Sequence, residues 1–243
     1  MRVLLLSDIH ANLAALDACL ADAERAGRAD RVWVLGDTVG YGPRPVECLL
    51  RIRGLDALAV AGNHELAATD RLPLSQFNAH AAAAAQWTAG QLTPDAAGYV
   101  TSLPLRATEG EFTLVHGTPR DPVWEYMLSV SQGVASLPYL ETPGCAFGHT
   151  HVPTVMQFRG AEGGIRQVTA GEAVQLREER WFVNPGSAGQ PRDGDPRAAY
   201  ALLETDERTV TYRRVEYDVA VTQRLMEEAG LPRPLIERLS YGY

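Results

Sequence analysis

The chain has 243 residues, of which 46% are hydrophobic, and a formal net charge of −8 at pH 7. This length suits one α/β domain with a sizeable core, and the acidic balance argues against a general nucleic-acid groove, which needs a basic stripe. All basic residues are arginine, and the three cysteines are widely spaced among apolar residues, which predicts buried reduced thiols.

The N-terminal stretch lacks the apolar run and cleavage site of a signal peptide. No apolar run elsewhere approaches the ~18 residues of a membrane span. We therefore expect a cytoplasmic protein that does not enter a membrane.

The first predicted strand, Arg2–Ser7, ends at a carboxylate and an imidazole, Asp8 and His10. Their i, i+2 spacing would direct both side chains to one side of an extended backbone. A helix over Leu13–Ala26, capped by Asn12, follows and leads to a second strand. This β-α-β unit predicts a parallel pair of strands.

Val32–Leu35 is a short apolar run typical of a strand buried on both faces, and it is soon followed by Asp37. Ligands of open α/β sheets lie at the carboxyl ends of strands, so Asp37 would face a crevice. The third predicted strand, Leu55–Ala61, ends shortly before Asn63 and His64. Taken alone, those two residues are better explained by a turn with a helix cap.

The segment Leu66–Leu105 is rich in alanine, the best helix former, and is interrupted by prolines. We expect a helical insertion there, after a short helix over Val46–Arg53. His80 lies inside the insertion, away from any strand end, so we interpret it as a surface or packing histidine rather than a ligand.

The next predicted strand, Glu111–Val115, ends at His116, and a later short apolar strand leads to His149 and His151. Two histidines at i, i+2 directly after a strand are hard to explain as core or as solvated surface. Between these strands, the segment Arg120–Pro138 could form a wall of the crevice, and we assign no role to its aromatic residues.

The remainder, about residues 154–243, has a hairpin-like pattern that predicts a second, antiparallel sheet within a single domain of residues 1–243. The turn Asn184–Ser187 is interpreted as structural. We expect strands at Val155–Arg159, Ile165–Thr169, Trp181–Val183, Ala198–Glu204 and Thr209–Tyr217, a turn at Gly160–Gly164, a closing helix at Val219–Ala229 and a tail at Leu231–Tyr243.

Metal-ligand residue types gather at five of these strand ends, and five of the six histidines are among them. Carboxylate, imidazole and amide oxygen without thiolate suit Mn²⁺, Fe or Zn²⁺ better than Ca²⁺. Their number favours two ions that share a bridging carboxylate, Asp37, and such pairs lie about 3.5–4 Å apart and clamp the oxygens of a displacement at phosphorus. The set is Asp8, His10, Asp37, Asn63, His64, His116, His149 and His151.

The order of these motifs resembles the calcineurin-like metallophosphoesterases, and the match extends from Met1 to about Ser187. The resemblance implies a four-layer α/β/β/α sandwich, in which two mixed β-sheets pack face to face with helices outside. The matching blocks are Asp8-Ile9-His10, Gly36-Asp37, Gly62-Asn63-His64-Glu65, His116 and Gly148-His149-Thr150-His151.

The resemblance also implies the roles of the site residues. A metal-bound hydroxide would attack phosphorus, and His64 would be the acid for the leaving group. The cofactor would be two divalent metal ions. We expect Mn²⁺, with Fe, Zn²⁺ or Ni²⁺ as alternatives. One ion would be held by Asp8, His10, Asp37 and His151, and the other by Asp37, Asn63, His116 and His149.

The branch of the family follows from two missing arginines. Serine/threonine protein phosphatases of this family carry Asp-Arg-Gly after Gly-Asp and an arginine before Gly-Asn-His, whereas this chain has Thr38–Pro43 and Val60-Ala61 there. It looks more like the small bacterial phosphodiesterase-like branch. This resemblance implies a metal-dependent hydrolase that cleaves phosphodiester bonds of a small phosphorylated substrate, and it leaves cleavage of phosphomonoester bonds open.

Three alternatives stay open, as does the oligomeric state. The chain could be a phosphoprotein or nucleotide phosphomonoesterase. It could be a non-catalytic metal-binding scaffold, like the retromer subunit with this fold, although every ligand position is filled here. A nuclease of the double-strand-break-repair type is disfavoured by the acidic charge and the lack of DNA-binding segments.

Overall fold

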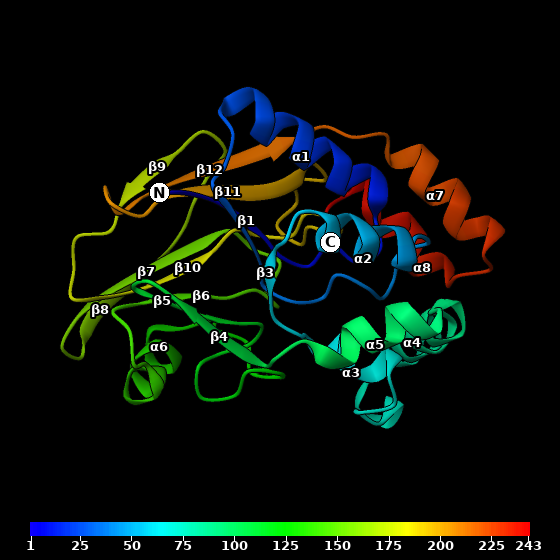
Figure 1. Cartoon of the computed structure of the whole chain (residues 1–243), viewed down its shortest axis with the longest axis horizontal. Coiled ribbons are helices and arrows are strands. Elements are labelled where there is room, and N and C mark those ends of the chain that lie inside the picture. The colour runs from blue at the N-terminus through cyan, green and yellow to red at the C-terminus, as the bar shows by residue number, and fades with distance from the viewer.

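The computed structural model describes all 243 residues and contains two mixed sheets of six strands each (Figure 1). The first sheet has the order β3 (Leu58–Ala59), β2 (Arg31–Val34), β1 (Arg2–Leu6), β11 (Ala198–Glu204), β12 (Thr209–Val215) and β9 (Ala173–Gln175). The second has the order β4 (Arg106–Glu109), β5 (Phe112–Val115), β6 (Gly144–Ala146), β10 (Arg180–Asn184), β7 (Thr154–Arg159) and β8 (Glu162–Gln167).

Helices lie on the outer faces of both sheets, with α1 over the first and α6 over the second (Figure 1). This arrangement confirms the expected four-layer sandwich. The α-helices are α1 (Leu13–Ala26), α2 (Pro45–Gly54), α3 (Asn63–Ala68), α4 (Ala79–Gln91), α5 (Pro94–Ser102), α6 (Val130–Ser136), α7 (Val219–Glu228) and α8 (Arg233–Glu237). Three short 3₁₀ helices are η1 (Leu74–Gln76), η2 (Leu137–Tyr139) and η3 (Arg238–Ser240).

The core is built by the two-residue period of the strands. In β1, Val3 and Leu5 belong to the cluster between the sheets, where Trp33 and Trp181 also lie. The alternate residues of the same strand pack instead against the apolar face of α1. A strand buried on both faces reads as a continuous apolar run, which is why this central strand could be recognised from the sequence.

Several sequence-based expectations are confirmed. Strands β1 and β2 are parallel, and Asn12 caps α1 by accepting a hydrogen bond from the Ala15 N–H. The alanine-rich insertion is helical, and His80 is exposed on α4. The three cysteines are buried and free. No helix in the structure combines the length and apolar character that crossing a bilayer requires.

The C-terminal strands join a different sheet from the one predicted. Ala198–Glu204 and Thr209–Tyr217 were expected in the second sheet, but β11 pairs antiparallel with β1, with Val3 opposite Leu203. Only β7, β8 and β10 of this region belong to the second sheet. Alternation of apolar and polar residues shows that a strand is half-buried, but it does not show which strand will be its neighbour. Strand β1 pairs with β2 on one side, and its other side was free to pair with β11.

The predicted tail is also wrong, because it contains α8 and η3. Leu235 and Leu239 of these helices are buried in a small cluster with Tyr41 and Met226. A helix of five residues is too short to show a clear apolar period, so its packing could not be inferred from the sequence.

Smaller corrections concern element boundaries. The third strand is only Leu58–Ala59, and the hairpin turn is Gly160–Ala161, with β8 already beginning at Glu162. Strands β4 and β9 and helix α6 were not predicted.

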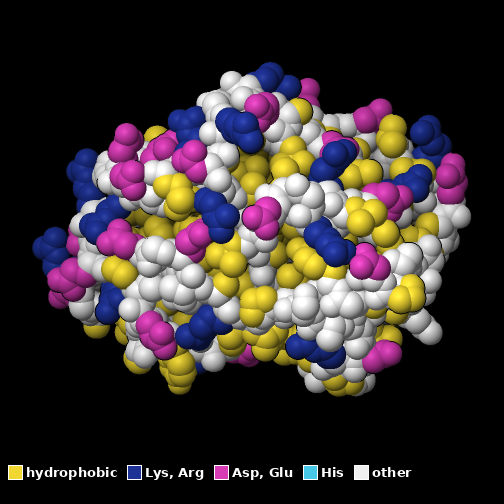
Figure 2. Space-filling model, viewed as in Figure 1, with side chains coloured by type: hydrophobic (Ala, Val, Ile, Leu, Met, Phe, Trp, Pro, Cys, Tyr) yellow, Lys and Arg dark blue, Asp and Glu magenta, His cyan; other side chains and the backbone are white.

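On the face seen in Figure 2, arginines and acidic side chains are interspersed rather than gathered in a stripe.

The packing of the C-terminal helices can be tested by truncating Leu239. The Leu239→Ala change should lower the free energy of unfolding by about 2–5 kcal/mol, because it opens a cavity in a buried cluster. Leu50→Ala, at a leucine that is 55% exposed, should change it by no more than about 0.5 kcal/mol. Urea unfolding measures both, and equal small effects would show that the segment is a tail after all.

Candidate metal centre

The eight candidate side chains meet at one edge of the molecule, where strands from both sheets end. Asp8 follows β1, Asp37 follows β2, His116 follows β5 and His149 follows β6. Parallel strands that point the same way bring their carboxyl ends to one edge. All eight residues are buried, with no more than 4% of any of them exposed.

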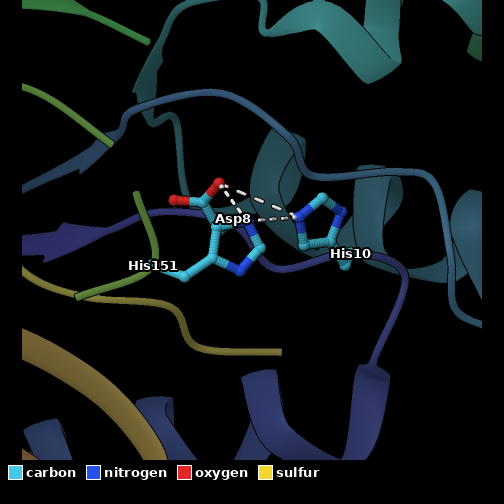
Figure 3. A group of neighbouring side chains, drawn as sticks. All are labelled: Asp8, His10 and His151. Atoms are coloured by element: carbon cyan, nitrogen blue, oxygen red, sulfur yellow. Dashed lines mark hydrogen bonds and ion pairs between the residues drawn. The ribbon is translucent and has the colours of Figure 1, made fainter. Parts of the chain in front are cut away.

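The first group consists of Asp8, His10 and His151 (Figure 3). The Nε2 atoms of the two histidines lie 3.2 Å apart, and Asp8 Oδ1 is 3.1 Å from His151 Nε2 and 3.8 Å from His10 Nε2. Asp8 Oδ1 is buried and makes no hydrogen bond of acceptable geometry. Three ligands of a single cation have this arrangement, in which a carboxylate oxygen without a hydrogen bond lies beside two imidazole nitrogens.

The second group consists of Asp37, His116 and His149, with Asn63 beside it. His116 Nε2 lies 3.2 Å from Asp37 Oδ2, 3.0 Å from His149 Nδ1 and 3.1 Å from Asn63 Oδ1. The same Asp37 Oδ2 is 3.8 Å from His10 Nε2 of the first group. Asp37 therefore lies between the groups, in the position of a shared carboxylate.

Backbone carbonyls fix the ring nitrogens that face away from the two groups. His10 Nδ1 lies 3.1 Å from Val39 O, and His116 Nδ1 lies 2.8 Å from Leu35 O. His151 Nδ1 is 2.6 Å from Gln190 O, and His149 Nε2 is 3.2 Å from Trp124 O. A carbonyl can only accept, so each outer nitrogen donates and each inner nitrogen of a neutral ring is a bare lone pair. Histidines that bind a metal commonly donate their other ring N–H to such an acceptor.

Five of the candidate ligands have left-handed backbone conformations. A positive φ is uncommon outside glycine, costs strain, and clusters at functional sites. The expected extended backbone around the i, i+2 pairs is therefore wrong: the backbone turns at each ligand and aims its side chain into the site. The φ angles are 50° at Asp8, 48° at His10, 52° at Asp37, 65° at His149 and 61° at His151.

His64 differs from the other four histidines in two ways. It lies in the first turn of α3, where its N–H donates to Asp37 Oδ1 at 3.0 Å, so an argument from alternating strand directions does not apply to it. Its Nδ1 is buried without a hydrogen-bond partner, and no carbonyl orients the ring. The ring instead contacts His10, Tyr41 and Phe77, with centroid separations of 5.0, 4.3 and 5.3 Å.

The electrostatics of the site favour positive charge beside Asp37. Burial opposes the charge on His116, but the Asp37 and Asp8 carboxylates and the Leu35 carbonyl together outweigh it and raise the pKa of His116 to about 9. Burial would also raise the pKa of Asp37, yet the surrounding histidines hold it well below its ordinary value. For His149, burial dominates and lowers the pKa to about 3. The carboxylates thus remain charged and attract a cation.

Glu65 is a functional residue that the sequence analysis did not assign. Its buried carboxylate accepts hydrogen bonds from the N–H groups of Asp37 and Gly62, both at 2.8 Å, and of Val39 at 3.1 Å. Burial, reinforced by the charge of Asp37, raises its pKa to about 7. Glu65 ties two ligand-bearing loops together, and its place three residues after a helix cap was the signal that could have identified it.

The aromatic residues left unassigned do form a wall of the site. Tyr126 is stacked on His149, with ring centroids 4.0 Å apart and planes 20° apart, and is 40% exposed. Trp124 supplies the carbonyl behind His149 and packs against Phe77. The predicted structural turn supports the other side, where Ser187 Oγ donates to the Asp8 carbonyl oxygen at 2.7 Å.

Comparisons with known proteins agree with this geometry. A metallophosphoesterase structure from Sphaerobacter thermophilus is 45% identical, with a TM-score of 0.90 over 100% of this chain and 99% of that one. An uncharacterized protein of Methanocaldococcus jannaschii is 33% identical over 99% of this chain and 98% of its own length. A symmetrical bis(5′-nucleosyl)-tetraphosphatase of Psychromonas ingrahamii is 35% identical, over 27% of this chain and 25% of its own.

The model of the calcineurin-like phosphoesterase superfamily domain matches residues 1–208, which include every candidate ligand. The region matched contains most of both sheets and all five strand ends of the site. The chain therefore belongs to the calcineurin-like phosphoesterase superfamily.

Proposed function

We propose that this protein is a dinuclear-metal phosphoesterase that hydrolyses phosphodiester bonds of a small phosphorylated substrate. The observation that carries the proposal is the set of four histidines whose outer nitrogens face backbone carbonyls and whose inner nitrogens converge near two carboxylates. The inner nitrogens lie 3.2 and 3.0 Å apart within the two groups, each beside a buried carboxylate, and a positive ion between them would interact favourably with nitrogens and carboxylates together.

The ligand sets follow the two groups. Asp8, His10 and His151 would hold one ion, and Asn63, His116 and His149 the other, with Asp37 shared. Nitrogen and oxygen ligands without thiolate suit Mn²⁺, our first choice, and also Fe, Zn²⁺ or Ni²⁺. The buried free cysteines lie elsewhere and favour a reducing compartment, which supports a cytoplasmic location.

The bound ions would supply Lewis acidity at the phosphoryl oxygens and would activate a water. The chain contributes the geometry: Glu65 and the carbonyls behind the histidines keep the ligands in place before substrate arrives. Groups that are already in place do not have to reorient during the reaction. This preorganisation accounts for a large part of the stabilisation of a transition state. The enclosure of the site excludes bulk water and strengthens these electrostatic interactions.

His64 is proposed to assist the leaving group. Its ring contacts His10, a proposed ligand, and also the buried Tyr41 and the partly buried Phe77, so it lies directly beside the ligand groups. Burial lowers the pKa of His64 to about 4. Its protonated form is therefore a stronger acid than an ordinary imidazolium, and its neutral form, which predominates near pH 7, still offers a ring N–H to a departing oxygen.

The substrate preference rests on what the loops around the site lack. The arginines of the monoester-clamping branch are missing at Thr38–Pro43 and before Gly62, and a singly charged diester needs less cationic clamping. The tetraphosphatase of Psychromonas ingrahamii is named for a bis(5′-nucleosyl) substrate, which supports a small nucleotide-like molecule over a phosphoprotein. A scaffold without catalysis remains the rival, and turnover decides between them.

The bridging role of Asp37 predicts unequal effects of two substitutions. Purified protein should contain about two transition-metal ions per chain and lose activity on chelation. Asp37→Ala should lower the occupancy of both ions, whereas His10→Ala should disturb only one. Elemental analysis measures this, and wild-type metal content in Asp37→Ala would exclude the bridge.

His64→Ala should keep both ions and lose activity selectively. We expect a loss on the order of 10²–10⁴-fold in kcat/KM on alkyl or nucleotide esters, whose oxygens leave poorly without a proton. A nitrophenyl ester, with an acidic leaving group, should lose far less. Equal losses on both substrates would show a role in orientation, and a missing ion would show that His64 is a ligand.

The diester preference can be measured with substrates that share one leaving group. On metal-stripped protein supplied with Mn²⁺, kcat/KM for bis(p-nitrophenyl) phosphate should exceed that for p-nitrophenyl phosphate by at least about tenfold, or about 1.4 kcal/mol. A clear preference for the monoester would assign the protein to the phosphomonoesterases instead.

A further inference from the structure

Tyr126 is the one exposed aromatic ring that packs against a candidate metal ligand. The ring is stacked on that of His149, with centroids 4.0 Å apart and planes inclined by 20°. Tyr126 is 40% exposed, whereas His149 is only 3% exposed. The tyrosine is therefore the outer member of the pair: one face of its ring covers the ligand, and solvent reaches the ring from the side away from His149.

The residues around Tyr126 hold its ring at this surface. The next residue, Met127, is buried in a hydrophobic cluster of the second sheet and anchors the segment. The preceding residue, Glu125, accepts a hydrogen bond from Thr118 Oγ1 at 2.6 Å and is ion-paired with Arg120. Both partners of Glu125 lie in the loop that follows β5. The position of the Tyr126 ring is thus fixed by the protein before any substrate arrives.

Further aromatic rings lead from this point to His64, the proposed acid. The Trp124 ring lies 6.4 Å from that of His149 and 5.0 Å from that of Phe77. The Phe77 ring in turn lies 5.3 Å from that of His64. Trp124 and Phe77 are half-buried. This side of the metal centre is therefore bordered by flat aromatic side chains, which suit a flat group of the substrate better than a further charged one.

An exposed tyrosine ring beside a phosphate-binding centre suits a nucleobase. Every base has a flat π-face that can stack on an aromatic side chain, and such stacking increases affinity with little dependence on which base is present. Tyrosine offers a large rigid surface at a low cost in conformational entropy. A single exposed apolar side chain elsewhere on a protein needs no explanation, but this ring lies directly on a proposed ligand.

We propose that Tyr126 is a stacking platform for a nucleobase of the substrate, while the ions hold the phosphate to which the nucleoside is attached. This inference rests on the proposed function of the metal centre. It narrows the substrate class to phosphate esters that carry a base. Tyr126 would distinguish substrates with a base from substrates without one, rather than one base from another.

Direct binding tests the platform without relying on turnover. Metal-loaded protein is titrated calorimetrically with two hydrolysis-resistant phosphonates, in which a methylene group replaces the ester oxygen of AMP or of ribose 5-phosphate. The wild-type protein should bind the adenosine phosphonate at least about fivefold more tightly than the ribose phosphonate. Tyr126→Ala should reduce this preference to less than about twofold. Elemental analysis of each variant verifies that both ions are present.

Two substitutions at the same position separate stacking from simple covering of His149. Tyr126→Phe keeps the ring and should keep most of the preference for the adenosine phosphonate. Tyr126→Leu keeps an apolar cover on His149 but has no ring, and should lose the preference. If Tyr126→Ala does not fold or loses an ion, these two variants still decide the question.

Tyr139→Ala is the matched control, since Tyr139 is 48% exposed on η2 and its ring contacts no candidate ligand. It should leave both dissociation constants unchanged.

Equal binding of the two phosphonates by the wild-type protein would overturn the platform, as would a Tyr126→Leu protein that keeps the preference. Equal weakening of both phosphonates in the Tyr126 variants would show that the tyrosine only holds His149 in place, which also overturns it. The proposed function fails separately, if the wild-type protein with its metals does not hydrolyse bis(p-nitrophenyl) phosphate. The preference for the adenosine phosphonate would then still be measurable.

Discussion

Four imidazole nitrogens and two carboxylates converge in the interior in two adjacent groups, and the surrounding structure holds them there. The inner nitrogens of His10 and His151 lie 3.2 Å apart, and those of His116 and His149 3.0 Å apart. The rings could adopt other orientations if they were free to turn. The hydrogen bonds from their outer nitrogens to backbone carbonyls prevent this, so the ligand geometry is a property of the backbone.

That backbone is itself under constraint. Left-handed residues carry five of the ligands, and close packing between loops excludes side chains where glycine occurs. A Cβ on Gly62 would lie 2.1 Å from Asp37 Oδ1, and one on Gly148 would lie 2.0 Å from Ser7 Oγ. The loops therefore pass so close to one another that there is no room for a Cβ atom at these two positions. The strain and the close approach persist because two sheets fix the strands from which these loops emerge.

The C-terminal third of the chain completes the site from outside. Strand β11 extends the first sheet beside β1, and the segment before it brings Ser187 and Gly189 onto the Asp8 carbonyl oxygen. Helices α8 and η3 then cover Tyr41, which contacts both His10 and His64.

The sequence by itself predicted which side chains converge at one edge of the sheets, and the resemblance of its motifs to a known family implied the layer order of the fold. Buried strands show as apolar runs, parallel strands end at one edge, and the residue types at those ends predict a metal site; Asp8, Asp37 and His116 could be named as candidates for these reasons. The tertiary structure alone decided which sheet receives β11, that α8 is packed rather than loose, and that His64 begins a helix. It also decided the left-handed turns and the stacking of Tyr126 on His149. Strand partners, short helices and side chains that meet across the chain depend on contacts between distant residues, and local periodicity contains no record of such contacts.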